Sequence, residues 1–591
     1  MNKIKTLTLA IAAISAANAQ AFEFNAGPVE AQLNTTLSYG IAMRTEDPNK
    51  GLVHPGTLAA IHGGSASDYY SVGGNSYNAD DGTLNYEKND IFTNVVKGSM
   101  DLELVWGNSG LFVRGSAFYD YEIMDEDPAF TPYIDEAKEA AGSGYDLLDA
   151  FVWHNFEVGN VPVSARLGRQ VVSWGESTFI QGGINSINPV NASAARKPGV
   201  EVKEILLPVN MAYANIGLTD DLTLETFYQL EWEKTRPDAC GTFFSTSDIA
   251  ADGCGPVLLG SDLSQEEYLA GYIDPSQQLP VTERTDPDEP SDDGQYGLAL
   301  RWYSEALGDT EFGLYYMNIH ARLPAASIKV TSGDGDNLDA TYHIEYVEDI
   351  QISGLSFSRG TESGWSIGGE VSLKQDYPIN WNGNELIAAA NNASYGLLTQ
   401  EAIAASDDGS ILGDSLEGYD LYDVWQAQIT FIKFFDQVAG ASRLSFVSEV
   451  GATYIQDLGD GVYGRSSAFG FGASQEACAE QVGDQEQLNA NTSYCTDDGF
   501  IEEFAAGIRV KAALDYPGAL LGANLQPNFS LGYDHGTGEQ FEDKRITTSL
   551  GLNFDYLNTY SGGIAYVMYD GSDVDQLDDR DNVSLNVKVS F

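Results

Sequence analysis

Long apolar runs are scarce in this sequence of 591 residues. A helix that spans a membrane needs about 20 consecutive, mostly apolar residues, and no segment after residue 21 has that character. Transmembrane helices are therefore not expected. Apolar residues still make up 43% of the chain, alongside 62 Gly and 32 Tyr. Their dispersed distribution is typical of a transmembrane β-barrel, whose strands alternate between lipid-facing and lumen-facing residues.

Positive charge is also scarce, because 30 Lys and Arg residues stand against 87 Asp and Glu residues, for a formal net charge of −57. Nucleic-acid binding needs basic side chains that neutralise phosphates, so we expect no nucleic-acid partner. Solvation by acidic loops explains the excess most simply, and divalent-cation binding is the more specific alternative. The last acidic tract is a weak candidate for Ca²⁺ without EF-hand spacing, through Asp570, Asp573, Asp575 and Asp578.

Only four cysteines occur, and none forms the Cys-x-x-Cys motif of zinc or thiol-exchange sites. They fall into two local pairs, Cys240 with Cys254 and Cys478 with Cys495. Three connectivities are possible, and the local one is the simplest. Each such disulfide would contribute roughly 3 kcal/mol in the chain-entropy model. Paired cysteines of this kind fit an oxidising compartment.

Hydrolase motifs are absent: no Gly-x-Ser-x-Gly sequence occurs, and the six His residues are scattered. We therefore predict no enzymatic activity and no cofactor. A Ser-His-Asn site built across adjacent strands would leave little trace in a sequence, so an outer-membrane phospholipase stays open as an alternative. For His154 and His320, which fall in predicted strands, a structural or lumen-lining role is the simpler interpretation.

Residues 1–21 have the features of a secretory signal peptide. Lys3 and Lys5 carry positive charge, residues 6–17 form a short apolar core, and small residues flank two cleavage sites before position 22. We expect export, cleavage near Gln20 or Phe22, and a mature chain that forms a single β-barrel domain over residues 22–591. Because few residues separate Ala21 from the first predicted strand, no N-terminal plug domain is expected.

Alternation of apolar and polar residues predicts the strands. It is clearest at the C-terminus, where VSLNVKVSF (583–591) alternates without a break. We predict an all-β, antiparallel transmembrane barrel of about 18 strands, within a range of 16–20. The predicted strands are 29–44, 91–106, 111–122, 147–158, 161–174, 206–217, 222–233, 296–304, 312–321, 343–358, 365–375, 421–435, 444–454, 504–516, 526–535, 545–556, 563–570 and 583–591.

The connections between these strands differ in length on the two sides. Short turns follow the even-numbered strands, whereas most odd-numbered strands are followed by long, acidic loops. Bacterial barrels have short periplasmic turns and long extracellular loops. The asymmetry therefore predicts that both cysteine pairs are extracellular and that the chain ends in the periplasm.

A barrel of about this size leaves an aqueous lumen unless a segment fills it. The 175–204 loop is the best candidate for an inward-folded constriction, because it is the least acidic long loop and contains Phe and Ile residues. An ordinary surface loop is the alternative. Candidate residues of the lumen and constriction are Glu176, Arg196, Lys197, Glu201, Lys203 and Glu204 in the loop, and Arg114, Arg166, Arg509 and Lys511 on predicted lumen faces.

The last strand must pair with the strand at 29–44 for the barrel to close without open edges. Its lipid face comprises Val583, Leu585, Val587, Val589 and Phe591. A terminal aromatic residue on such a strand resembles the signal that the outer-membrane assembly machinery reads. We therefore expect that machinery to be a partner.

Several motifs resemble one family. They are RLGRQVVSWGE at 166–176, NPVN at 188–191, RKPG at 196–199, KE at 203–204, LP at 207–208, CGTFFST at 240–246 and DGC at 252–254. Together they resemble the proteobacterial outer-membrane family catalogued as domain of unknown function 1302 (DUF1302), most strongly over residues 150–255. Members are often encoded beside a lipoprotein-like partner and an RND-type exporter. The resemblance therefore implies envelope traffic of lipid-like or hydrophobic compounds.

Two functions follow from these observations. In the first, the protein is an outer-membrane channel or transport protein for small or hydrophobic, lipid-like compounds. In the second, it is a closed-lumen receptor, or the outer-membrane component of an RND-linked transport machine without channel activity of its own. In both, we expect it to lie in the bacterial outer membrane, surrounded by lipid and lipopolysaccharide.

Overall fold

The structure is a computed structural model of the chain. It describes residues 22–260, 262–273, 281–334, 337–391, 393, 395–407, 409–475, 477–480 and 487–591. The predicted signal peptide, residues 1–21, lies outside the described residues. Within the described part of the chain, none of the helices is long and apolar enough to cross a membrane.

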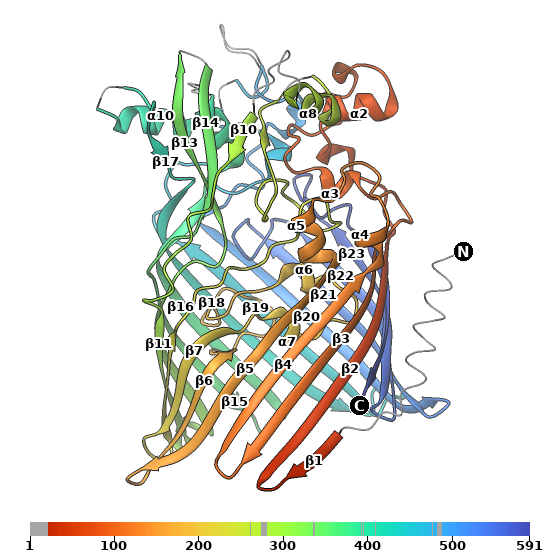
Figure 1. Cartoon of the computed structure of the whole chain (residues 1–591), viewed down its shortest axis with the longest axis vertical. Helices are drawn as coiled ribbons and strands as arrows, with labels where there is room; N and C mark the ends of the chain where they lie inside the picture. Colours follow the sequence, from red (N-terminus) through yellow and green to blue (C-terminus); the bar gives the residue numbers. More distant parts are fainter. Residues whose placement is uncertain are drawn as a thin grey trace.

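Most of the chain forms one antiparallel sheet that closes on itself (Figure 1). The sheet has 19 strands, of which β1 (Phe22–Ala26) is a short addition at one edge and the other 18 form the barrel. The barrel strands are β2 (Val29–Arg44), β3 (Ile91–Trp106), β4 (Ser109–Asp120), β5 (Ser143–Val158), β6 (Val161–Gln170), β7 (Val209–Gly217), β8 (Leu222–Gln229), β11 (Tyr296–Ser304), β12 (Thr310–Ile319), β15 (Ile350–Gly360), β16 (Trp365–Asn380), β18 (Tyr419–Asp436), β19 (Arg443–Ile455), β20 (Phe504–Leu520), β21 (Ala523–His535), β22 (Ile546–Tyr556), β23 (Tyr560–Asp570) and β24 (Asn582–Ser590).

The last strand closes the barrel by pairing with the first. The register of β24 on β2 runs from Thr36 opposite Ser590 to Arg44 opposite Asn582. Beyond it, the Thr35 amide donates to the Phe591 carbonyl at 2.6 Å, and the Phe591 amide donates back at 2.9 Å. β1 folds back on residues 29–33 and covers the part of the β2 edge that β24 does not reach. This pairing leaves β2 with a partner along its whole length, as the prediction requires.

The predicted strand count and the sidedness of the loops are confirmed. Each predicted strand has a counterpart in the barrel, the short turns lie at one end, and the long segments lie at the other (Figure 1). The strand predicted at 343–358 is wrong at its start, because His343–Glu345 belong to a strand outside the barrel and β15 begins at Ile350. Alternation continues on both sides of that connection, so the pattern hides the turn, where Asp349 has a φ of 62°.

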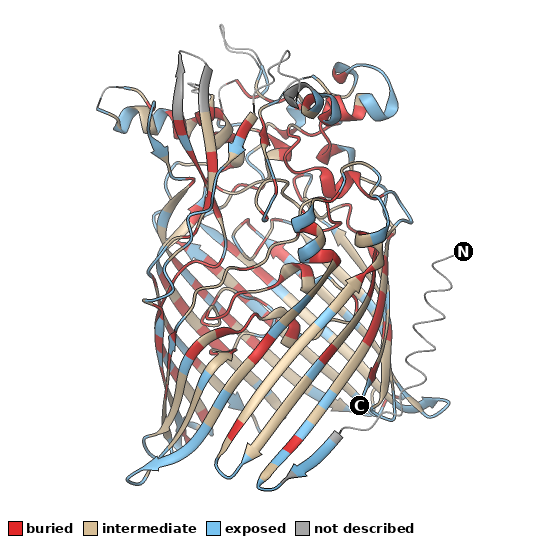
Figure 2. Ribbon diagram, viewed as in Figure 1, coloured by how far each residue is buried: buried red, intermediate tan, exposed pale blue. Residues whose placement is uncertain are grey.

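The two faces of the wall differ in character. Met100, Leu550 and Ile564 are large apolar side chains on the outer face and are about half exposed, at 51%, 51% and 47%. Lumen-facing charges such as Lys97 and Asp101 form ion pairs inside the barrel. A charge on the lipid face near the midplane would cost roughly 2–4 kcal/mol. The alternating pattern therefore sorts charge into the lumen, and Figure 2 shows further buried segments inside the barrel outline.

The extracellular segments form a structured cap, which we define as the described residues within 45–90, 121–142, 230–295, 320–349, 381–418, 456–503, 536–545 and 571–581. It contains a second sheet in the order β17-β13-β14-β10-β9. Its strands are β9 (Val257–Leu258), β10 (Val281–Arg284), β13 (Ala325–Asp334), β14 (Asn337–Glu345) and β17 (Ser415–Leu416). Both disulfides, Cys240–Cys254 and Cys478–Cys495, lie in the cap with the local pairing.

Short helices complete the structure. In the cap lie α2 (Pro55–His62), α3 (Asp81–Leu84), α4 (Tyr121–Asp125), α5 (Asp135–Ala137), α8 (Gln265–Ile273), α9 (Gly383–Ala390) and α10 (Leu397–Ala405). The other two, α6 (Ala192–Ala195) and α7 (Val202–Ile205), belong to the connection between β6 and β7. Figure 1 shows α6 and α7 within the outline of the barrel.

Candidate functional site

The connection between β6 and β7, residues 171–208, enters the barrel. We call it the β6–β7 loop; it contains the predicted constriction at 175–204. One part of it contacts the lumen faces of β16 and β19, and another part contacts β3 and β24. Around the barrel, β16 and β19 lie six and eight strands away from β6. The loop therefore crosses the lumen.

Two carboxylates on the far wall hold the first part of the loop. Glu370 on β16 accepts hydrogen bonds from the amides of Glu176 at 2.5 Å and Ile184 at 3.1 Å. Glu449 on β19 accepts from the amides of Thr178 at 3.1 Å and Phe179 at 2.5 Å. Hydrogen bonds from backbone amides to an ionised carboxylate are stronger than neutral ones. We call these contacts the carboxylate latch.

Apolar side chains also hold this part of the loop. Trp174, Ile184 and Ile187 are almost fully buried and belong to one apolar cluster with the wall residues Met211 and Tyr315. Glycine 354 makes room for this contact, since a Cβ there would lie 2.6 Å from Ile184 Cγ1. The indole of Trp174 also donates to Glu225 Oε2 at 2.8 Å. The loop is thus packed as well as hydrogen-bonded.

The second part of the loop holds most of the predicted constriction residues, and ion pairs bind it to the near wall. Glu204 accepts from Lys97 of β3 at 2.6 Å. Glu201 pairs with Lys588 of β24 at 3.2 Å and with Lys203 at 3.1 Å. Lys203 also lies 3.5 Å from Asp101. These pairs join the loop to the strands next to the β2–β24 seam.

Two predicted basic residues of the loop make other contacts. Lys197 Nζ donates to the Ala141 carbonyl at 2.9 Å and lies 3.3 Å from the centre of the Phe118 ring. Arg196 lies 3.5 Å from Asp238 and stacks near the Phe244 ring. The predicted constriction residues of the loop therefore do not lie together. Glu176 faces the far wall, whereas Arg196 and Lys197 lie at the cap side of the near wall.

The four predicted wall residues do not form one site. Arg114 bonds Asp101 and Asp149 at 2.9 Å each, and Arg509 bonds Asp534 at 2.5 Å. Arg166 lies 4.2 Å from the centre of the Tyr213 ring. Lys511 is exposed, and no ion pair is found for it among the described residues. Arg114 and Arg509 thus neutralise acids within the wall, and only Arg114 is linked, through Asp101, to the loop.

A lumen cavity of about 330 Å³ lies beside the loop. The loop residues Gln181, Asn185 and Ser186 line one side of it, and Lys374 and Tyr377 line another. Lys374 is buried, with its Nζ 4.0 Å from the centre of the Tyr377 ring and 3.9 Å from Glu539. The cavity thus combines polar loop groups with apolar wall residues such as Ile350 and Ile352.

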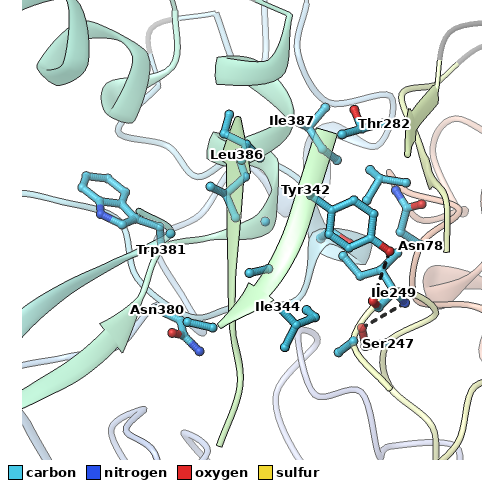
Figure 3. Close-up of a pocket in the computed structure, with 18 of the residues that line it drawn as sticks. Asn78, Ser247, Ile249, Thr282, Tyr342, Ile344, Asn380, Trp381, Leu386 and Ile387 are labelled. Atoms are coloured by element: carbon cyan, nitrogen blue, oxygen red, sulfur yellow. Dashed lines mark hydrogen bonds between the residues drawn. The ribbon is translucent and has the colours of Figure 1, made fainter. Parts of the chain in front are cut away.

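A second cavity, of about 200 Å³, lies in the cap between β13, β14, α9 and residues 247–250 (Figure 3). Apolar side chains dominate its lining, among them Ile249, Ile344, Trp381, Leu386 and Ile387. We call it the cap cavity.

The Tyr342 hydroxyl is one of the few polar groups in the cap cavity. It donates to the Ile249 carbonyl at 3.2 Å (Figure 3). Burial raises the pKa of Tyr342 to about 12, so the side chain stays neutral. Pro324 and Asn380 line both the cap cavity and the lumen cavity. The two cavities are therefore neighbours.

Sequence patterns did not identify the latch or the cavities. Alternation places Glu370 and Glu449 on the lumen face, but it cannot show that both meet backbone amides of a segment almost 200 or more residues earlier. The cap cavity is assembled from α9, the β13–β14 hairpin and the 247–250 segment. Such contacts between distant segments have no local sequence signal.

Of the four candidate Ca²⁺ residues in the last acidic tract, Asp575 forms an ion pair in the described structure. Both carboxylate oxygens of Asp575 accept from Arg545, at 2.5 and 2.7 Å. Asp573 is exposed. Burial, with the neighbouring Asp575 and Asp579 next in importance, raises the pKa of Asp578 to about 6. Within the described residues, the acidic groups close enough to share a metal ion do not include these side chains.

One Ser–His contact bears on the hydrolase alternative. Ser109 Oγ and His154 Nδ1 lie 2.8 Å apart as a cross-strand pair at the periplasmic ends of β4 and β5. A catalytic triad also needs a group that orients the second imidazole nitrogen. For the described residues, no hydrogen bond to His154 Nε2 is found. The pair therefore lacks the third member that the alternative requires.

A closed, 18-stranded antiparallel barrel with an apolar outer band and a loop-crossed lumen is a barrel of the outer-membrane type, which supports a location in an outer membrane. The chain belongs to the family described as "Protein of unknown function (DUF1302)", which it matches over residues 3–591.

Among solved structures, the chain is similar to Acinetobacter baumannii OccAB1, with 12% identity, a TM-score of 0.40, and coverage of 97% of this chain and 98% of that one. For Pseudomonas aeruginosa OccK9 (OpdG) the values are 11%, 0.39, 95% and 97%. For the outer membrane channel DcaP of Acinetobacter baumannii they are 8%, 0.34, 97% and 99%. At this low identity and TM-score, nothing about the solute or the mechanism of these proteins is inferred for this chain. No curated protein matches the chain.

Proposed function

We propose that this protein is an outer-membrane transport channel for small apolar or amphipathic compounds, which bind first in the cap cavity and then pass through the lumen under control of the β6–β7 loop. The observation that carries the proposal is the adjacency of the two cavities, which share Pro324 and Asn380 in their linings. A compound that leaves the cap cavity past Pro324 and Asn380 reaches the lumen cavity, which residues of the loop line on one side.

The chemical class follows from the lining of the cap cavity. Its side chains are mostly aliphatic or aromatic, and a pocket of this kind binds apolar groups by removing their surface from water. The apolar cluster that contains Trp174 and Ile184 of the loop also contains Tyr342 and Trp381 of the cap. A cluster of buried apolar side chains thus extends from the cap to the constriction.

The loop is suited to act as a gate because part of its attachment is reversible. The carboxylate latch consists of hydrogen bonds to two side chains, and water can replace such partners when the loop moves. In this proposal, residues 1–21 direct export and are removed, and the protein works in the outer membrane. A periplasmic or lipoprotein partner and an RND-type exporter would supply direction to the transport.

Filling the cap cavity tests the proposal. Gly383 lines the cavity, and a Cβ there meets only Ser467 Cβ, at 3.7 Å. Gly383→Phe should occupy the cavity, whereas Gly383→Ala is the matched control that leaves it open. We expect the purified protein to bind a fluorescent medium-chain fatty acid, G383F to bind at least 10-fold more weakly, and G383A to bind normally.

The same experiment separates the proposal from its alternatives. Equal binding by wild type and G383F would contradict a role for the cap cavity. Binding without any flux of the probe through reconstituted vesicles, together with co-purification of a periplasmic partner, would instead favour a closed-lumen receptor or a component of a larger machine.

A further inference from the structure

Two buried carboxylates and one partly buried carboxylate meet in the cap, away from the lumen and the cap cavity. Oxygens of Asp80, Asp81 and Asp248 all lie within 4.8 Å of one another. The first two residues lie at the start of α3, and Asp248 follows the disulfide-bonded Cys240 by eight positions. Gly82 permits this close packing, since a Cβ there would lie 2.6 Å from the Ser245 carbonyl oxygen and 2.7 Å from that of Thr242.

Some carboxylate oxygens of the cluster already accept hydrogen bonds from neighbouring residues. Asp80 Oδ2 accepts from the His54 amide at 3.2 Å, and Asp248 Oδ2 accepts from the Asp81 amide at 3.3 Å. Asp81 Oδ1 accepts from Thr131 Oγ1 at 2.6 Å and from Gln265 Nε2 at 2.9 Å. These bonds fix the orientation of the three carboxylates.

Three other oxygens at the same place have no donor. Asp80 Oδ1, Asp248 Oδ1 and Gln265 Oε1 are buried, and no hydrogen-bond partner is found for them among the described residues. Gln265 is 5% exposed, and its amide already touches the carboxylate of Asp81. Buried oxygens are rarely left without a partner, and each one costs about 1–3 kcal/mol. Three such oxygens on side chains that contact one another indicate a missing ligand that accepts electron pairs.

The local charge also lacks compensation. None of the three carboxylates forms an ion pair with a Lys or Arg of the described chain, and Arg580 acts at longer range on Asp248. Arg580 and Arg44 share Asp579, so this buried triad has a net charge of +1. Together with the three carboxylates it leaves −2, which one divalent cation would neutralise.

There is room for an ion at this place. A cavity of about 100 Å³ adjoins the cluster: Asp81, Thr131, Asp248 and Gln265 line it together with residues around the Cys240–Cys254 disulfide, whereas Asp80 is not among its lining residues. A water molecule needs a share of about 30 Å³, so an ion and one or two waters fit. Every side-chain donor is an oxygen, which excludes a preference for thiolate- or imidazole-binding metals.

We propose that Asp80, Asp81, Asp248 and Gln265 form a Ca²⁺ site that ties together the β2–β3, β4–β5 and β8–β11 segments of the cap. Ca²⁺ takes 6–8 oxygen ligands at about 2.3–2.6 Å in flexible geometry, and extracellular Ca²⁺ sites have dissociation constants of about 10⁻⁴–10⁻³ M. Carboxylate, amide and water oxygens supply that set here. Thr131, bonded to Asp81, positions the carboxylate from the β4–β5 side.

Protonation is the other way in which the cluster could be neutralised. Burial, the largest cause, raises the pKa of all three carboxylic acids above the ordinary range. A protonated cluster would need no cation and would not respond to Ca²⁺. The experiment must therefore show binding that depends on these side chains.

Calorimetry on the full-length protein in detergent, after treatment with EGTA, provides that test with CaCl₂ as the titrant. We expect one saturable site in the wild type and at least 10-fold weaker binding in Asp80→Asn and Asp248→Asn. Asp286→Asn is the matched control, because this exposed acid of the cap lies outside the cluster; it should bind as the wild type does. Absence of saturable binding, or equal binding by all four proteins, would overturn the proposal.

Limited proteolysis of the cap distinguishes a variant that has lost the Ca²⁺ site from one that binds Ca²⁺ poorly because its cap is misfolded. Ca²⁺ should slow cleavage of the wild-type cap at least 10-fold and have no effect on D248N. Without Ca²⁺, D248N should be cleaved no faster than the wild type, because the substitution removes a repelling charge. Faster cleavage of D248N without Ca²⁺, with an unchanged response to Ca²⁺, would assign the cluster a purely structural role and refute the site.

Discussion

Weakening the carboxylate latch should open the lumen more often. Glu449 accepts the amides of Thr178 and Phe179. In Glu449→Gln the charge is lost, so the two hydrogen bonds that Oε2 accepts from these amides become neutral ones. A hydrogen bond to a charged group contributes about 1.5–3 kcal/mol, so the variant should lose about 2–3 kcal/mol. Because 1.4 kcal/mol corresponds to a factor of ten, the released loop should be populated about 30–150-fold more.

The same reasoning applies to Glu370, with one difference. Glu370 accepts the amides of Glu176 and Ile184 and also the side-chain amide of Gln428 at 3.0 Å. Ile184 remains packed in the apolar cluster when the hydrogen bond is lost, so Glu370→Gln should have a smaller effect than Glu449→Gln. The free-energy effects of the two substitutions should not be additive, because both residues hold the same segment.

Planar-bilayer recording of open probability is the assay. Glu103→Gln is the matched control, because it removes the same charge from the lumen face of β3, and no hydrogen bond from Glu103 to the β6–β7 loop is found in the described structure. E449Q should open far more often than the wild type, whereas E103Q should behave as the wild type does. Equal open probabilities in E449Q and wild type would refute the latch.

Three other perturbations have expected outcomes. Deleting Phe591 removes both backbone hydrogen bonds to Thr35 and the terminal aromatic side chain, so it should strongly reduce membrane assembly, measured by heat-modifiable gel migration; normal assembly would show that this residue is dispensable. Replacing Cys240 and Cys254 by Ser should destabilise the cap by about 3 kcal/mol without unfolding the barrel, as measured by proteolysis, and an unaffected cap would contradict this assignment. Burial raises the pKa of Glu542 to about 7, so its stabilising contribution is present below about pH 4.5 and lost as pH rises through 7. Glu542→Gln should therefore stabilise the 536–545 loop by about 3 kcal/mol at pH 8 and have little effect at pH 5, as measured by hydrogen exchange. An equal effect at both pH values would argue against this role of Glu542.

The barrel could be predicted from the sequence because a strand that separates lipid from water imposes a period of two over many residues. β2 (Val29–Arg44) and β3 (Ile91–Trp106) match the predicted ranges 29–44 and 91–106. The pattern fails where the chain leaves the membrane. The end of β14 and most of β15 alternate in the same way, so the pattern predicts one strand at 343–358, although a connection with Asp349 at positive φ separates the two.

The functional site could be predicted only in part. The low acidity of the 175–204 segment indicates that it differs from the other loops, and the structure places it across the lumen. Its partners depend on which strands face each other in the closed barrel. Glu449 lies 270 residues from Phe179 and Asp248 lies 167 residues from Asp81, and no spacing rule connects such pairs.

The role of the β6–β7 loop as the gate of a transport path is the central claim, and conductance tests it most directly. The measurement compares single-channel current through the wild type with current through a variant in which residues 176–204 are replaced by a short Gly-Ser linker. A lumen of this width without its crossing segment should be an open, water-filled pore. We expect a large, steady current in the variant and a small or intermittent current in the wild type. Equal currents through the two proteins would contradict it.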